Sequence, residues 1–119
     1  MGRKQIAVDF DDTIYDLKSN GWNGGRIVGP PMDGTKEAFE YLFKSYNIVI
    51  FTARITMSSG GINKIQVYQI RNWLKKYDLN QYVVDITNIK NSWMVAFIDN
   101  RSIHFGDWKT VIKLLPKVV

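Results

Sequence analysis

The 119-residue chain has no cysteine, one histidine, three prolines and no apolar run long enough to cross a lipid bilayer. Without cysteine there are no disulfide bonds, no zinc sites built on thiolates and no cysteine nucleophile. The first residues, Met1-Gly2-Arg3-Lys4, lead into a short apolar segment and lack the hydrophobic core of a signal peptide. We therefore expect a cytoplasmic protein that is not attached to a membrane.

Positive charge is in excess: 16 lysines and arginines stand against 11 acids, for a formal net charge of +5. Such a charge favours anionic partners, and phosphate-bearing molecules fit best. A solvated basic surface explains the same charge with fewer assumptions, and no basic-aromatic stripe marks a nucleic-acid site. The length and ordinary composition predict one domain spanning residues 1–119, with no obligate protein partner evident.

Short apolar segments alternate with segments of helical periodicity. Segments rich in branched residues predict buried strands at about 5–10, 47–52, 82–86 and 94–99. Apolar residues at helical spacing predict helices at about 34–45 and 62–77, and a last helix between Asp107 and Pro116. We expect Asp33 and Asp107 to be N-caps and Pro116 to stop the last helix.

Residues 14–31 resist any periodic interpretation. They contain Asn20-Gly21, Asn23-Gly24-Gly25 and Gly29-Pro30-Pro31, which are turn signals. We expect a small flap or hairpin there.

Strands that are nearly all apolar and alternate with helices predict a parallel sheet of about four strands covered on both faces. This is a three-layer, Rossmann-like α/β fold. The carboxyl ends of parallel strands lie at one edge of such a sheet, where ligands bind. The polar residues at or near those ends are Asp9 with Asp11, Thr52, Lys90, and Asp99 with Asn100. We expect the fold to bring these residues together.

Asp9 and Asp11 can point the same way only if the chain leaves extended geometry after Asp9, and the polar run ending at Thr13 permits such a turn. Two close carboxylates repel unless a cation lies between them. Oxygen ligands favour a hard ion, and Mg²⁺ also bridges to substrate phosphate. Asp99 and Asn100 would complete the ligand shell. Taken alone, Asp-x-Asp-x-Thr is more simply a pair of acids at a turn.

Two further residues have simple structural explanations when each is considered alone. Thr52 closes an apolar strand, where its hydroxyl and adjacent backbone N–H groups could hold a phosphoryl oxygen, although threonine commonly ends strands. Lys90 precedes the fourth strand and could neutralise phosphoryl charge, although it is equally one more exposed lysine. The order in which these residues follow successive strands makes the combination informative.

With these residues in order, the chain resembles the haloacid dehalogenase (HAD) superfamily. Asp9-x-Asp11-x-Thr13, Thr52, Lys90 and Ile98-Asp99-Asn100 look like its motifs I to IV, and the resemblance covers about residues 6–108. It implies a phosphatase in which Asp9 attacks phosphorus and Asp11 acts as general acid and then base. Thr52 and Lys90 would stabilise the phosphoryl group, and Thr13 would fix the turn that aims Asp11.

The resemblance also implies a Mg²⁺ ion held by the Asp9 side chain, the Asp11 carbonyl and residues 99–100. The sequence departs from the commonest pattern here, because Asp99 is followed by Asn100 rather than by a second acid. We favour Asn100 as the ligand with Asp99 in support. The segments 14–33 and 52–62 are too short for a cap domain, so the site should be open.

Within the superfamily, Phe51-Thr52-Ala53-Arg54 is similar to the 3′-phosphatase domain of phage-type polynucleotide kinases. This similarity implies that Ala53 and Arg54 contact the substrate phosphate, together with Thr13. It also suggests a nucleotide or a nucleic-acid 3′-phosphate as substrate, although an open site does not exclude other small phosphorylated molecules.

Two other functions are also compatible with the sequence. A phosphate-receiving receiver domain has similar length, paired acids and Mg²⁺, but its phosphoacceptor should end the third of five strands. A degenerate HAD fold kept as a binding module is favoured only if Asn100 abolishes metal binding.

Overall fold

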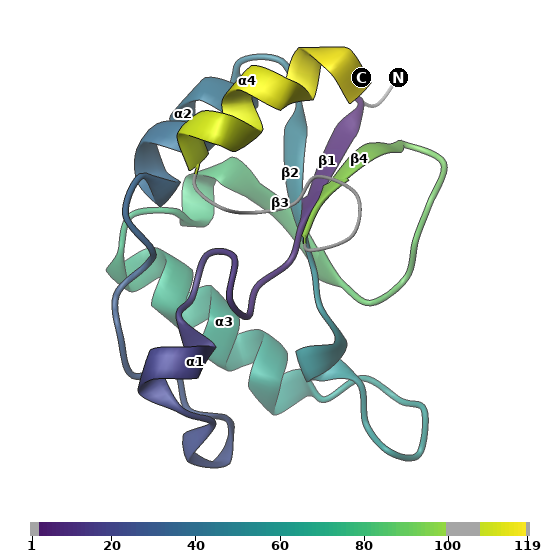
Figure 1. Cartoon of the computed structure of the whole chain (residues 1–119). Helices are drawn as coiled ribbons and strands as arrows, with labels where there is room; N and C mark the ends of the chain where they lie inside the picture. Colours follow the sequence, from purple (N-terminus) through teal and green to yellow (C-terminus); the bar gives the residue numbers. More distant parts are fainter. Residues whose placement is uncertain (1–2, 100–107, 119) are drawn as a thin grey trace.

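The computed structural model describes residues 3–99 and 108–118, which form a parallel sheet with helices packed against it (Figure 1). The strands are β1 (Gln5–Val8), β2 (Asn47–Phe51), β3 (Val83–Thr87) and β4 (Met94–Ile98). Their order across the sheet is β3-β2-β1-β4, and all neighbours are parallel. All four predicted strands are confirmed, with boundaries shifted by one or two residues.

The helices are α1 (Leu17–Asn20), α2 (Thr35–Phe43), α3 (Lys64–Lys76) and α4 (Trp108–Val118). Short 3₁₀ turns form at Asn23–Gly25, Ala53–Ile55 and Asn80–Tyr82. Among the described parts of the chain, no helix is long and apolar enough to cross a membrane.

Two predictions about helix ends are wrong. The N-cap of α2 is Gly34, with φ +85°, rather than Asp33. Helix α3 is confirmed and starts at Lys64, because the Asn63 side chain accepts hydrogen bonds from the backbone N–H groups of Ile65 and Gln66. Helix α4 continues through Pro116 to Val118, since proline removes one hydrogen bond but has a helical φ. The proposed cap Asp107 lies outside the described residues.

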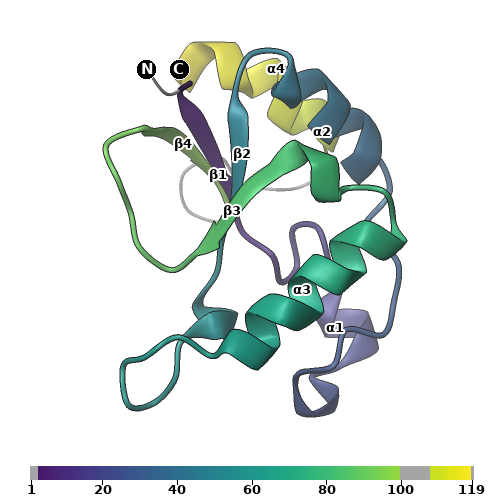
Figure 2. The ribbon, with the colours of Figure 1, turned by 180° about the vertical axis from the view of Figure 1, so that it is seen from behind.

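The segment 14–31 folds as a flap rather than as a hairpin, the other form that the sequence allowed. It contains α1 and the first 3₁₀ turn, and an isolated bridge between Tyr15 and Pro31 closes its base. The Trp73 indole N–H of α3 donates to the Gly29 carbonyl at 2.7 Å, and the Tyr15 hydroxyl accepts from Val28 N–H at 3.1 Å. These bonds hold the flap alongside α3, as the view from behind shows (Figure 2).

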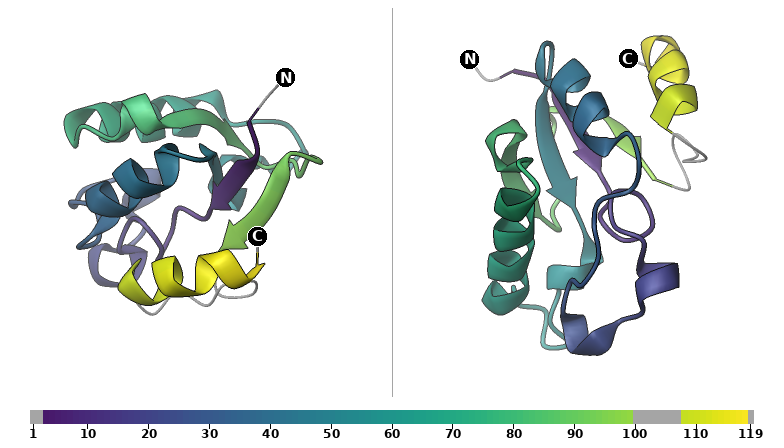
Figure 3. Two further views of the ribbon diagram at one scale, coloured as in Figure 1. Left: turned by 90° about the horizontal axis from the view of Figure 1, so that it is seen from above. Right: turned by 90° about the vertical axis from the view of Figure 1, so that its left-hand side faces the viewer.

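The large hydrophobic core lies on one face of the sheet. Side chains of Ile6, Val8, Ile48 and Ile50 point from the central strands into a cluster that also contains Phe39 of α2, Trp73 of α3 and Val111 of α4. The steps from β1 to β2 and from β2 to β3 move in the same direction across the sheet. Right-handed crossovers therefore put α2 and α3 on the same side (Figure 3).

The opposite face, which we call the bare face, has a small apolar cluster made only of strand residues: Ala7, Val49, Phe51, Met94 and Phe97. Six residues, 88–93, connect β3 to β4 without a helix. The α/β class and the parallel sheet are confirmed. The described residues do not form the expected third layer, because this connection is too short for a crossover helix.

Candidate functional site

Asp9 follows β1 at the carboxyl edge of the sheet, where its backbone N–H donates to the Ile98 carbonyl at 3.1 Å. This bond places Asp9 beside the end of β4 and the following Asp99. Both carboxylates line a cavity of about 310 Å³, with Ala53 from the end of β2 and the apolar residues Ala7, Phe51, Phe97 and Ile98. The structure therefore brings together three of the predicted site residues: Asp9, Ala53 and Asp99.

The surroundings of the Asp9 carboxyl disfavour its ionised form. Burial raises the pKa of Asp9 from 3.8 to about 6, and repulsion from Asp11, Asp99 and Asp12 adds to this rise. The backbone N–H of Phe10 donates to Asp9 Oδ1 at 2.9 Å and opposes the rise. A partly buried carboxyl surrounded by other acids attracts a cation.

The predicted turn after Asp9 is present. The Phe10 carbonyl accepts from the backbone N–H groups of Ile14 and Tyr15 at 3.1 Å, and Asp12 has φ +60°. Thr13 is 2% exposed within this turn and does not line the cavity. It lies where a residue that shapes the turn would lie, away from the cavity expected to receive phosphate.

Asp11 and Arg54 form an ion pair in which the arginine is buried and the aspartate is partly exposed. Arg54 Nη2 lies 2.7 Å from Asp11 Oδ1, and Arg54 Nε lies 3.2 Å from both carboxylate oxygens. The Arg54 side chain is 0% exposed and that of Asp11 is 23% exposed. Arg54 thus contacts the predicted acid/base, whereas we expected it to contact substrate. Nothing in the sequence separations predicted this pair.

Thr52 is also buried. Its Oγ1 accepts from the Arg54 backbone N–H at 3.1 Å, and its own N–H donates to the Thr87 carbonyl at 2.9 Å. The first contact makes Thr52 the cap of the short turn that begins at Ala53. Thr52 itself does not line the cavity that contains Asp9, although its neighbours Phe51 and Ala53 do.

Lys90 lies in the 88–93 connection and is exposed. Its Nζ lies 5.0 Å from the centre of the Phe97 ring, and Phe97 lines the cavity that contains Asp9. A cation–π contact of this kind holds the ammonium group at the border of the cavity.

The residues present fit a magnesium ion only in part. Asp9 and Asp99 offer oxygen ligands in one cavity, and Mg²⁺ is commonly bound through one or two carboxylates plus waters and substrate phosphate. Asn100 lies outside the described residues. Within residues 3–99 and 108–118, no group of three or more His, Cys, Asp or Glu side chains is arranged to hold a metal. The donor chemistry fits Mg²⁺ with few protein ligands.

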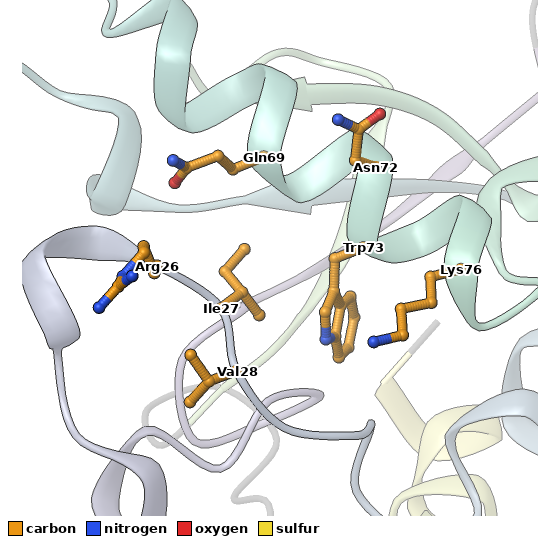
Figure 4. Close-up of a pocket in the computed structure, with 7 residues that line it drawn as sticks. All are labelled: Arg26, Ile27, Val28, Gln69, Asn72, Trp73 and Lys76. Atoms are coloured by element: carbon orange, nitrogen blue, oxygen red, sulfur yellow. The ribbon is translucent and has the colours of Figure 1, made fainter.

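A second cavity, of about 340 Å³, lies between the flap and α3 (Figure 4). Its lining residues are Arg26, Ile27, Val28, Gln69, Asn72, Trp73 and Lys76. None of the predicted catalytic residues lines it, so we assign the chemistry to the cavity at the sheet edge.

No protein-family model matches the chain, and searches of curated proteins and of solved structures found no significant match.

Proposed function

We propose that this protein is a Mg²⁺-dependent phosphomonoesterase of the HAD type that works through a phosphorylated Asp9. The observation that supports it most is the cavity in which Asp9, Asp99 and Ala53 meet at the carboxyl edge of a parallel sheet. The turn that follows Asp9 carries Asp11 close enough to affect the Asp9 carboxyl electrostatically.

The proposed reaction has two displacements. In the first, an Asp9 carboxylate oxygen forms a bond to phosphorus, the bond from phosphorus to the leaving oxygen breaks, and Asp11 gives that oxygen a proton. In the second, a water molecule attacks phosphorus and Asp11 takes its proton. The bond between Asp9 and phosphorus then breaks to release inorganic phosphate.

Charge must be neutralised throughout, because dianionic phosphate approaches a carboxylate. The Thr52 hydroxyl and the backbone at Ala53 would donate to phosphoryl oxygens, and Lys90 would reach over Phe97. The Asp9 carboxylate, the Asp11 carbonyl and residues 99–100 would hold Mg²⁺, whose chemistry is to balance the carboxylate and phosphate charges.

The test is release of phosphate from p-nitrophenyl phosphate with and without Mg²⁺. We expect Asp9→Asn to lower kcat by at least about 10³-fold, since it removes the nucleophile. Asp85→Asn, an exposed carboxylate on β3, is the matched control and should keep wild-type activity. Turnover that survives in Asp9→Asn would overturn the mechanism.

A receiver domain is the second candidate, and acetyl phosphate distinguishes it. Stable labelling of Asp9 without turnover would favour it, whereas the absence of both labelling and turnover would favour a binding module. The described residues contain four strands, and Asp9 follows the first of them, which supports the phosphatase.

A nucleotide or nucleic-acid 3′-phosphate as substrate and a cytoplasmic location remain part of this proposal. A screen of nucleotides, 3′-phosphorylated oligonucleotides, metabolites and phosphopeptides tests the substrate.

A further inference from the structure

Arg54 is the one charged residue that is buried among the residues whose burial the structure describes, and its side chain is 0% exposed. A guanidinium group removed from water must find compensating contacts, or the fold loses stability. Arg54 finds them on three sides: the Asp11 carboxylate, the Gly25 carbonyl at 3.0 Å from Nη1, and Gln66 Oε1 at 3.4 Å. Asp11 lies in the turn that follows Asp9, Gly25 lies in the flap, and Gln66 lies in α3.

Aromatic rings complete the enclosure. The guanidinium carbon lies 4.5 Å from the centre of the Trp22 ring, and 5.3 Å and 5.7 Å from the rings of Phe10 and Tyr15. Phe10 and Tyr15 are fully buried, whereas Trp22 is 50% exposed. Trp22 therefore separates Arg54 from solvent on the flap side. This contact gives a reason for a tryptophan at a position that is half exposed.

Gly25 shows how closely the flap approaches α3. A Cβ atom at this position would lie 1.9 Å from Gln66 Nε2, and the residue has φ +89°. Only glycine meets both conditions without a shift. The close approach brings the Gly25 carbonyl within reach of Arg54.

We infer that Arg54 is a positioning residue that orients Asp11 and fastens flap residues 22–25 to it, so that flap and acid/base are set together. This inference rests on the proposed phosphatase function. It replaces the expected contact between Arg54 and substrate, because Nε, Nη1 and Nη2 all have protein partners and the side chain is out of reach of a ligand. Arg54 acts on the reaction through Asp11.

The activity test uses leaving groups of different quality. A good leaving group such as p-nitrophenolate needs little protonation, whereas an alkoxide from glycerol 2-phosphate needs the acid. We expect Arg54→Ala to lower kcat at least about tenfold more on glycerol 2-phosphate than on p-nitrophenyl phosphate, with Arg54→Lys between wild type and Arg54→Ala. Asp11→Asn should show the same pattern, and the double variant should be no slower than Asp11→Asn.

The matched control is Arg71→Ala. Arg71 donates to Asn80 Oδ1 and the Val83 carbonyl, both at 2.9 Å, and has no contact with Asp11. Its loss should affect both substrates equally. Equal losses on both substrates in Arg54→Ala, or losses that multiply with those of Asp11→Asn, would show that Arg54 only supports the fold.

Amide hydrogen exchange tests the link to the flap without any substrate. Arg54→Ala should speed exchange at Gly25, Arg26 and Val28 by at least about tenfold more than Arg71→Ala.

Trp22→Leu keeps the ion pair between Arg54 and Asp11 and is the variant to measure if Arg54→Ala does not fold. It should speed the same amides by about threefold, as expected for a lost cation–π contact. If Trp22→Leu and Arg54→Lys exchange these amides as slowly as wild type, Arg54 does not fasten the flap to Asp11. An inactive wild type with fast flap exchange in these variants refutes the phosphatase and leaves the fastening intact.

Discussion

The two faces of the sheet differ in what covers them. One carries α2, α3 and α4 over a continuous core, and its strand residues Ile6, Val8, Ile48 and Ile50 are 0% exposed. On the bare face, Phe51 and Phe97 pack edge to face at 5.7 Å and remain partly exposed among the described residues. The cavity with Asp9 and Asp99 opens on this second side. Stability is concentrated on one face and the candidate chemistry on the other.

The same comparison explains the strain at Asp9. Side chains alternate along β1, so Ala7 and Asp9 share the bare face while Ile6 and Val8 enter the core. Asp9 is partly buried beside other acids instead of being fully solvated. This is an unfavourable position for a carboxylate in the free protein and a favourable one for a group that must meet a cation and a phosphate.

The largest expected effect contrasts one phenylalanine from each face. Phe39 of α2 is 0% exposed and packs against Trp108 at 6.2 Å, so Phe39→Ala should lower the free energy of unfolding by about 3–5 kcal/mol. Phe97→Ala should cost only about 1–2 kcal/mol, because less apolar area leaves water there. Urea titration followed by circular dichroism measures both. If Phe39→Ala and Phe97→Ala lower the free energy of unfolding equally, the bare face is covered in solution.

Titration of Asp9 gives the next effect. Its pKa is about 6 in the folded protein against 3.8 in the usual case, so between these values the folded state holds a proton that the unfolded state has lost. Its contribution is therefore greatest at low pH and is lost as pH rises through about 6. The free energy of unfolding of Asp9→Asn relative to wild type should rise by about 2 kcal/mol from pH 4 to 7.5, a value reduced for partial exposure.

This comparison is made in EDTA by urea titration at each pH. Added Mg²⁺ should stabilise wild type more than Asp9→Asn, because the variant lacks one carboxylate ligand. A difference between the two proteins that does not change with pH would contradict the assigned electrostatics.

The smallest effect concerns Lys90, which contacts Phe97 at the border of the cavity. Lys90→Met keeps an apolar chain over the ring and removes the charge. We expect kcat/KM for p-nitrophenyl phosphate to fall about tenfold, or about 1.4 kcal/mol, since the lysine is exposed and partly screened. Lys109→Met, an exposed lysine on α4, should leave it unchanged. Identical effects of the two substitutions would remove Lys90 from the site.

Local patterns were enough to predict the strands and the edge where the site lies. Branched apolar runs marked all four strands, and parallel pairing then put Asp9 and Asp99 at the same edge of the sheet. That the two residues share one cavity depends on the strand order, which makes β1 and β4 neighbours. Helix ends were predicted less well: Asn63 caps α3 and Gly34 caps α2, because capping depends on backbone angles that residue identity alone does not decide. The flap contained turn signals but no indication of what it would contact.

The order of apolar and polar residues by itself determined a parallel α/β sheet and a row of acids at its carboxyl edge. Both follow from periodicity and chain direction, which are local properties. Only the tertiary structure decided that Arg54 pairs with Asp11, 43 positions earlier, and that the helices gather on one face. A buried charge selects its partner from whatever the fold brings near it. The coverage of a face depends on the length and handedness of the connections.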